Sequence, residues 1–455
     1  MADATLYAII VSLLSLIILH SFLRRKPKNL PPGPPSLPII GHLHLLKFPL
    51  HRTLYNLSNE HGPIMSLWFG VRHIMVVSSL PLAEECFTKN DIVLANRPKD
   101  EAERLMLRLA RNGFRDFHRV ELKTLFTELT FNVIMRMISG KRYYGEDVSV
   151  DKAEASEFRE IIKQIVENGG TSYEGDFLPI LDWIDYKGFK KMIVRLGKRA
   201  DAFLQNLVDE HRRRKGDPEF ADSMISHLLR LQEAQPENYS DLMIKALVLV
   251  MLGAGTDTTS VMLEWVMTNL LNNPDKLKKA QDEIDSIIGH DRLMEEPDVS
   301  KLSYLQCIIF ETFRLSTTVP LLVPHESSAE CTIGEYTVPR GTIVLVNAWA
   351  IHRDPELWED PKTFEPERFE GGNGEEHQKL VLPFGLGRRA CPGAPLAQRV
   401  MGLTLGLLLQ CFDWKRVSKE EIDMTEGNGL TMPKVVPLEL MCKVRPPMEN
   451  LIPKD

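Results

Sequence analysis

The sequence predicts a mainly helical fold with small β-sheets, preceded by one membrane-spanning helix at the N-terminus. Residues 241–272 form an apolar run long enough for one helix through a whole domain. Residues 101–232 are largely helical in pattern, with breaks near 169–170, 179 and 216–218. Convincing strand patterns are confined to short β-branched runs, so the sheets are expected to be small.

Composition narrows the class of protein. The chain has 455 residues, 44% of them hydrophobic and 26% charged, so it can bury a large core. The net charge of −7 argues against a nucleic-acid partner, because phosphate binding needs a basic surface. The basic run from His211 to Lys215 is therefore interpreted as a solvated helix end. The six cysteines contain no C-x-x-C pair, so neither a disulfide framework nor a zinc site is indicated.

The membrane signal is the stretch Thr5–Leu23, whose mostly apolar residues would span about 28 Å as a helix. A cleaved signal peptide would need a basic start and a small-residue cleavage site, and both are missing, so we expect a retained signal anchor. Basic residues crowd positions 24–28 and place the rest of the chain in the cytosol. The expected units are an anchor with its basic stop (1–26), a stiff proline-rich hinge (27–41) and one folded domain (42–455).

Two regions carry strand patterns. Residues 63–79 hold β-branched and apolar runs around Gly70, which predict a hairpin or a pair of short strands. Residues 331–348 indicate short strands with turns at Gly334 and Gly341. The C-terminal residues alternate turns and short strands. No internal repeat is present, which favours a single domain.

The long apolar segment 241–272 contains the motif AGTDTT. Glycine inside a helix costs roughly 1 kcal/mol relative to alanine, so something other than helix stability favours Gly255. Asp257 and Thr258 place an acid beside a hydroxyl, which suits proton transfer to a small bound molecule, while Ala254 and Gly255 leave room for that molecule and a substrate. We expect a kink where the backbone ladder opens. A transmembrane helix is the competing interpretation, but a central aspartate is costly in lipid, so a core helix is favoured.

Glu311 and Arg314, in ETFRL, lie three residues apart on one face of a predicted helix, where they can pair. Exposed pairs of this spacing are common and contribute only tenths of a kcal/mol, so the spacing alone carries no weight. The motif FEPERF adds Arg368 in a loop upstream of Cys391. Together they predict a Glu/Arg/Arg cluster that holds this loop in place.

The run PFGLGRRACPG presents Cys391 in a glycine-framed turn. A thiolate ligand pushes electron density onto haem iron and favours O–O cleavage, and Cys391 is the candidate ligand. Gly387 and Gly393 let backbone N–H groups approach the sulfur, and Phe384 is expected to shield it. Arg389 is placed to bind a haem propionate. A lone cysteine is more often a small buried hydrophobe, but here the surrounding positions all fit one purpose.

The same run also matches the dinucleotide-binding pattern G-x-G-x-x-A at 385–390, after apolar residues that resemble a strand. The prolines argue against this alternative, because Pro392 and Pro395 would fall inside the opening turns of its helix. The helix is expected to start after Cys391.

Four motifs therefore stand in one order: the proline-rich hinge, AGTDTT, ETFRL with PERF, and PFGLGRRACPG. Over nearly its whole length the chain resembles the cytochrome P-450 superfamily. Stretches such as VLANRP, ELTFNVIMRMISGKRYYGED and LVNAWAIHRDP are similar to the plant isoflavone 2′-hydroxylase-like group. The resemblance implies the cytochrome P-450 fold on a single-pass anchor in the endoplasmic reticulum membrane.

The resemblance also implies a chemistry. Haem b would activate O2, and NADPH–cytochrome P-450 reductase in the membrane would supply the electrons. One oxygen atom would enter a C–H bond of a flat aromatic substrate and the other would leave as water. The implied site residues are Cys391 as iron ligand, Arg389, His325, Phe384, Gly387, Gly393, Ala254 and Gly255 around the haem, Asp257 and Thr258 for oxygen activation, Glu311, Arg314 and Arg368 as a structural cluster, and Leu321, Leu322 and Val323 beside the substrate.

The sequence departs from the family pattern after Pro98. In the family a sizeable segment separates ANRP from the next helix, whereas here that helix follows almost at once, so a segment expected between about 98 and 101 is missing. That segment ordinarily carries a substrate-recognition loop and a W-x-x-x-R motif whose arginine binds a propionate. The two W-x-x-x-R matches, at 68–72 and 349–353, belong to the hairpin and to AWAIHRDP and do not replace it. Thr317 also replaces a usual proline and is expected to loosen one wall of the substrate site.

The sequence thus predicts an anchored haem-thiolate monooxygenase that hydroxylates an isoflavone-like or flavonoid-like aromatic metabolite. A non-catalytic remnant that keeps the anchor and haem without turnover is the alternative, because loss of the segment opens the haem site to water. A nucleotide-binding oxidoreductase survives only if the purified chain binds NADPH directly and lacks the Soret band of haem.

Overall fold

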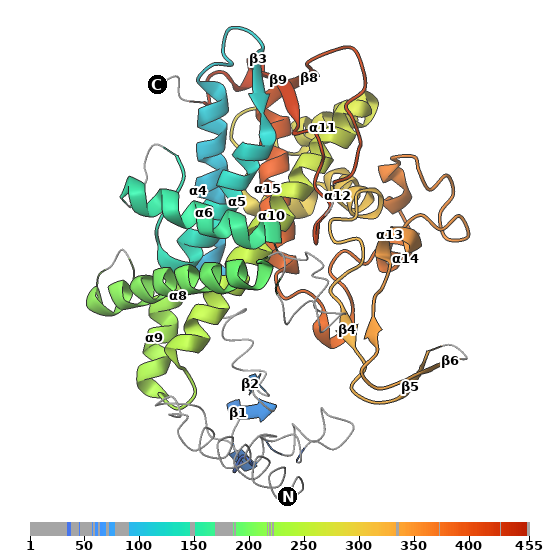
Figure 1. The fold of residues 1–455 in the computed structure, drawn as a ribbon. Coiled ribbons are helices and arrows are strands. Elements are labelled where there is room, and N and C mark those ends of the chain that lie inside the picture. Colours follow the sequence, from blue (N-terminus) through green and yellow to red (C-terminus); the bar gives the residue numbers. More distant parts are fainter. Residues whose placement is uncertain are drawn as a thin grey trace, which may run out of the picture.

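Figure 1 shows the fold as a computed structural model, in which helices predominate and the sheets are small, as predicted. The predicted anchor (1–26) and nearly all of the hinge (27–41) lie outside the residues that the structure describes. Apart from a few isolated positions, the described residues are 64–69, 72–77, 91–145, 151–168, 188–215, 223–333, 336–372, 374–427 and 429–452.

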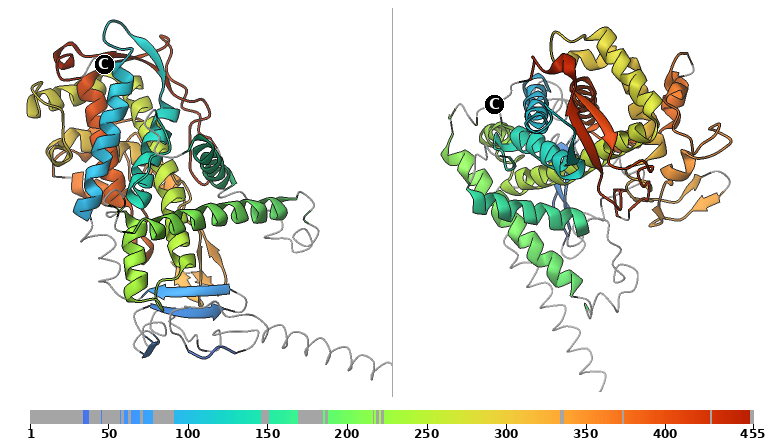
Figure 2. Two further views of the ribbon diagram at one scale, coloured as in Figure 1. Left: turned by 90° about the vertical axis from the view of Figure 1, so that its left-hand side faces the viewer. Right: turned by 90° about the horizontal axis from the view of Figure 1, so that it is seen from above.

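A bundle of four helices forms the core (Figures 1 and 2). α10 packs against α5 and α15, and α4 packs against both of these helices as well. Buried apolar residues from all four helices meet in one continuous cluster, and α5 and α10 also contribute to a second one. The four are α4 (Asp91–Ala110), α5 (Leu122–Ser139), α10 (Asp241–Asn272) and α15 (Ala394–Cys411).

α10 has the bounds that the sequence predicts. Ser240 caps its start by accepting a hydrogen bond from the Met243 N–H, and Pro274 follows its last turn. Among the described residues α10 is the one helix long and apolar enough to cross a membrane, but its C-terminal half is buried against neighbouring helices, as a core helix requires. The helix is continuous, so the expected opening at its glycines is not seen.

Further helices surround the bundle. α8 lies across the bundle and packs on α6, α9 and α10 (Figures 1 and 2). The surrounding helices are α6 (Lys152–Asn168), α8 (Phe189–Arg213), α9 (Met224–Ala234), α11 (Pro274–Ile287), α12 (Ser303–Leu315), α13 (Ala348–Ile351) and α14 (Gly374–Leu380).

The basic run at the end of α8, which was interpreted as solvated, differs from that interpretation at one residue. Residues 212–215 are exposed, as a solvated helix end requires. His211 is buried instead, with its ring nitrogens 2.8 Å from the Leu207 carbonyl and 3.1 Å from the Ser139 carbonyl. Burial lowers the pKa of His211, because the charged ring loses hydration.

The sheets are all antiparallel. β1 (Ile64–Phe69) pairs with β2 (Arg72–Val77), which confirms the predicted hairpin. β4 (His325–Glu326) pairs with β7 (Ile343–Val344), and β5 (Cys331–Ile333) pairs with β6 (Tyr336–Val338). Gly341 lies in the predicted turn with φ +81°, whereas Gly334 lies outside the described residues.

A three-stranded sheet of order β3–β9–β8 caps the bundle, as Figure 1 shows. β3 (His118–Glu121) lies inside the segment predicted to be helical, and that prediction is wrong there because its partner is distant in sequence. Val120 lies opposite Leu440. β9 spans Glu439–Val444 and β8 spans Phe412–Arg416.

α4 begins earlier than the sequence indicates. The helix expected near Glu101 starts at Asp91 and continues through Pro98. Only Lys99 and Asp100 separate the ANRP motif from the following helical pattern, so the two join into one helix.

Candidate functional site

The Cys391 turn (residues 383–393) lies between α14 and α15. Gly385 and Gly387 adopt φ angles of +67° and +70°, the left-handed region that glycine tolerates. The Cys391 N–H donates to the Phe384 carbonyl at 2.8 Å and closes the turn. α15 begins at Ala394, after the cysteine as predicted, and a helix rather than a strand precedes the turn, so the dinucleotide-binding alternative is excluded.

The Cys391 thiol is exposed, as are Arg388 and Arg389 beside it. Within the described part of the chain these three side chains form no hydrogen bond or ion pair. By contrast, burial raises the pKa of Cys307 and of Cys411 to about 12, so those thiols stay protonated. An accessible thiol with free guanidinium groups nearby is the donor set that a thiolate-bound haem with two propionates needs, and the residues therefore fit that group.

Phe384 and Gly393 flank the cysteine. The half-buried Phe384 ring packs edge-on against Phe313 of α12, with ring centroids 5.2 Å apart. A Cβ at Gly393 would lie 3.7 Å from the Cys391 sulfur. Phe384 thus ties the turn to α12.

His352 anchors the residue that enters the Cys391 turn. Its Nε2 accepts from the Leu382 N–H at 2.8 Å, and its Nδ1 lies 2.9 Å from the Thr317 hydroxyl. Burial, with help from Arg314 and Arg353, lowers the pKa of His352 to about 4, so the ring is neutral. Thr317 is itself buried and hydrogen bonded, so the expected loosening at this position is not seen.

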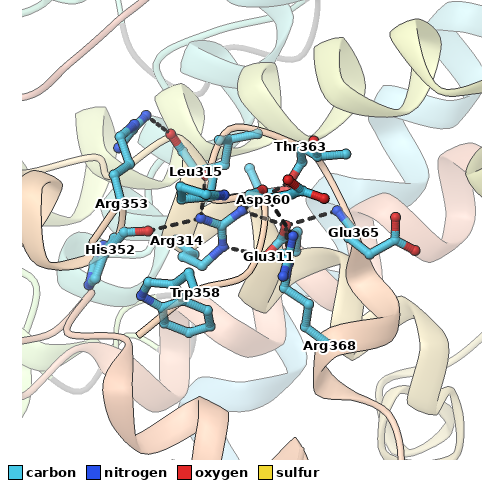
Figure 3. A network of polar contacts seen from close by, with 12 residues as sticks. Glu311, Arg314, Leu315, His352, Arg353, Trp358, Asp360, Thr363, Glu365 and Arg368 are labelled. Carbon is cyan, nitrogen blue, oxygen red and sulfur yellow. Dashed lines mark hydrogen bonds and ion pairs between the residues drawn. The ribbon is translucent and has the colours of Figure 1, made fainter. Parts of the chain in front are cut away.

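Glu311, Arg314 and Arg368 come together in a buried network (Figure 3). Arg314 donates from Nε and Nη2 to both carboxylate oxygens of Glu311, each at 2.7 Å. Arg368 Nε lies 3.5 Å from Glu311 Oε1, which also accepts from the Glu365 N–H at 2.8 Å. Arg314 further donates to the carbonyl groups of His352, Pro361 and Thr363, at 2.8, 2.7 and 3.0 Å.

This network joins α12 to the chain that leads into the Cys391 turn. Neither Glu311 nor Arg314 is exposed, in contrast to the ordinary surface pair of the same spacing. His352 links the Glu311 network to the Cys391 turn. Its carbonyl accepts from Arg314, and its ring accepts from the Leu382 N–H. The buried cluster thus holds in place the part of the chain that leads into the Cys391 turn.

The residues of both W-x-x-x-R matches belong to other local structure. The Arg353 guanidinium lies over the Trp349 ring at 4.0 Å and also bonds the Leu315 carbonyl, as Figure 3 shows for the latter contact. Trp68 belongs to β1 and Arg72 begins β2. Arg353 is therefore engaged in local structure, as expected.

The side chains of Asp257 and Thr258 on α10 form hydrogen bonds with different partners. The Thr258 hydroxyl donates to the Ala254 carbonyl at 2.7 Å, one turn earlier in the same helix. The Asp257 carboxylate accepts from the Thr431 hydroxyl at 2.7 Å. The described residues show no hydrogen bond between the Asp257 and Thr258 side chains, so the predicted pair is adjacent but not joined.

Gly255 lies where α5 and α10 approach each other closely. A Cβ there would approach the Ile134 Cδ1 atom of α5 to 2.8 Å, closer than side chains pack. Glycine therefore permits close contact between α5 and α10 at this position. Ala254 is exposed on α10, as its expected role beside the haem requires.

The remaining predicted residues follow α12. His325 lies exposed on β4, opposite Val344. Leu321 and Val323 are 44% and 65% exposed, which is unusual for large apolar side chains. Leu322 adopts φ +52°, and its N–H donates to the Val319 carbonyl at 3.1 Å. This segment offers apolar side chains that a flat aromatic molecule can contact.

Sequence reasoning missed Thr431 and His352. Thr431 meets Asp257 across 174 positions of sequence, and no local pattern reports such a pairing. His352 stands in the AWAIHRDP stretch and carries its own signal, a histidine directly after a short apolar run.

Comparison with known proteins adds the family. The Cytochrome P450 family matches residues 31–108 and 99–438. Cytochrome P450 81E8 of Medicago truncatula is 51% identical over 494 residues, covering 97% of this chain and 98% of that protein. Isoflavone 3′-hydroxylase of Medicago truncatula is 49% identical over 487 residues, with 95% and 96% covered. Isoflavone 2′-hydroxylase of Glycyrrhiza echinata is 49% identical over 471 residues, with 93% of each covered.

The alignments also show that this chain is shorter than its relatives. The first spans 494 positions, whereas 97% of 455 residues is about 441, so about 53 positions of that relative have no counterpart here. The two family matches overlap at 99–108, within α4.

Proposed function

The chain belongs to the cytochrome P450 family and is a monooxygenase, and we propose that it hydroxylates a flat aromatic plant metabolite of the isoflavone or flavonoid type. The observation that carries this proposal is the Cys391 turn, with an accessible thiol and two unengaged arginines. The relatives named as isoflavone 2′- and 3′-hydroxylases support the substrate class.

In this proposal Cys391 is the axial ligand of haem b, and Arg389 and His325 bind its propionates. When bound, a thiolate-ligated haem supplies the activation of O2. The overall reaction joins R–H, O2, two electrons and two protons to give R–OH and water. NADPH supplies the electrons through a membrane-bound cytochrome P450 reductase, and the anchor holds the chain on the endoplasmic reticulum.

The chain's own residues have three tasks. Asp257 and Thr258 hold and deliver the protons, because a positioned acid beside a hydroxyl suits general acid catalysis. Leu321, Leu322 and Val323 border the substrate. The Glu311 network and His352 keep the Cys391 turn at a fixed place, which a ligand must have before the cofactor binds.

The alternative is a chain that binds haem without turnover. The absence of about 53 positions relative to Cytochrome P450 81E8 favours it, because an open haem site admits water and releases activated oxygen unproductively. On either interpretation the missing segment belongs near residues 98–101.

The experiment uses membranes that contain the full chain and a plant reductase, supplied with NADPH and an isoflavone. We expect a product one oxygen atom heavier, with that atom derived from labelled O2. A lignan and an indole serve as substrate controls. NADPH consumption without any oxygenated product from these compounds would contradict hydroxylation and support the alternative.

A further inference from the structure

The C-terminal residues 431–438 lie along α10 and are held there by several groups. The Met432 carbonyl accepts from Trp265 Nε1 at 2.8 Å, and the Met432 N–H donates to the Thr318 carbonyl at 2.8 Å. Both polar groups of the Met432 backbone are therefore occupied. The preceding residue, Thr431, is the one that reaches Asp257, at 2.7 Å.

Two further contacts fix the same segment. The Leu438 N–H donates to Glu264 Oε1 at 2.8 Å, and the Lys434 ammonium lies 4.8 Å from the centre of the Trp265 ring. Glu264, Trp265 and Lys434 are all buried. The segment thus stays on α10 without any help from Thr431, so the Thr431 hydroxyl is not needed to fasten it.

We infer that Thr431 is a positioning residue that holds the Asp257 carboxylate for proton delivery, an inference that rests on the proposed function. Among the described residues, the Thr431 hydroxyl is the only side-chain donor to that carboxylate. It binds Oδ2 and leaves Oδ1 open to take up or release a proton. Because Met432 fixes the backbone next to Thr431, the hydroxyl is presented in a set direction, which lowers the entropic cost of orienting the acid.

A purely structural role predicts different behaviour. Such a role, exerted through the same hydrogen bond, would lower the melting temperature without changing product formed per NADPH or its pH profile. A positioning role makes its effect depend on Asp257, and a double-mutant cycle measures that dependence.

The test uses full-length Thr431→Val, which keeps the shape and removes the hydroxyl, together with Thr431→Ser, Asp257→Ala and the Thr431→Val/Asp257→Ala double variant. Thr425→Val is the matched control, because the exposed Thr425 hydroxyl donates to the Asp423 carboxylate at 2.6 Å in the same C-terminal region. Product formed per NADPH consumed and its pH profile are measured. The melting temperature of each variant is a second readout that needs no turnover.

For Thr431→Val we expect product per NADPH to fall about tenfold and the pH profile to shift, since a general acid contributes at least about a hundredfold when well placed. Thr431→Ser should stay within about twofold of wild type because it keeps the donor. In the Asp257→Ala background Thr431→Val should change neither product yield nor melting temperature further. Thr425→Val should match wild type.

Two results overturn the inference. The first is a Thr431→Val variant that behaves like Thr425→Val. The second is a double variant in which the losses of the two single variants add fully, either in product per NADPH or in melting temperature. Failure of the proposed function looks different. If Asp257→Ala itself turns over like wild type, the role of Asp257 is wrong. If Asp257→Ala loses product while Thr431→Val does not, the role of Thr431 alone is wrong.

Discussion

Replacing Arg314 by leucine should destabilise the fold by about 3–5 kcal/mol, because it leaves the buried Glu311 carboxylate without its main partner. Arg368, whose Nε lies 3.5 Å from Glu311 Oε1, can compensate only in part. The three carbonyl groups that Arg314 binds also lose a donor. With an unfolding entropy of about 2.1 cal/mol/K per residue, the loss corresponds to a melting temperature about 3–5 °C lower.

Calorimetry on the haem-loaded chain measures this shift. Lys278→Leu is the control, because Lys278 forms an exposed pair with Asp282 at 2.6 Å that should contribute less than about 1 kcal/mol. Arg314→Lys should fall between the two, since a lysine keeps the charge but cannot form the two-pronged contact. An Arg314→Leu variant that melts together with Lys278→Leu would refute the reasoning.

Two further predictions concern His352 and the glycines of α10. The folded pKa of His352, about 4, lies below its usual 6.5, so its contribution to stability is complete above pH 6.5 and is lost as the pH falls towards 4, by up to about 3 kcal/mol. Urea titrations should show a weaker fall over this range for His352→Gln, and equal slopes would contradict the prediction. Gly253→Ala, whose Cβ meets nothing within 4 Å, should stabilise the chain by up to about 1 kcal/mol, whereas Gly255→Ala should stabilise it less or not at all, because the end of the Ile134 side chain must shift to admit its Cβ. Thermal unfolding compares the pair, and an equal gain for both would be inconsistent with the packing described.

Local signals predicted much of this fold. The extent of α10 follows from the apolar run 241–272, and the start of α15 follows from the prolines after Cys391. β3 was missed because its four residues become a strand only by pairing with β9, far along the chain. Local pattern cannot report such non-local pairing.

The site residues also divide into those that local pattern predicted and those that depend on distant segments. The Glu311–Arg314 pair was predicted from spacing, but its complete burial depends on segments that the spacing does not contain. Gly255 was noticed as a costly residue in a helix, but its close approach to Ile134 on α5 is a contact that no local pattern reports. Thr431 carried no signal at all, since a threonine in a turn-rich segment is ordinary.

The central claim is that Cys391 ligates a haem in this shortened chain. A carbon-monoxide difference spectrum of reduced membranes tests it most directly, with Cys391→Ser and the exposed Cys331→Ser as paired variants. We expect the red-shifted band of a thiolate-ligated haem in wild type and in Cys331→Ser, and its loss in Cys391→Ser. Well-expressed wild-type protein without that band would contradict the account.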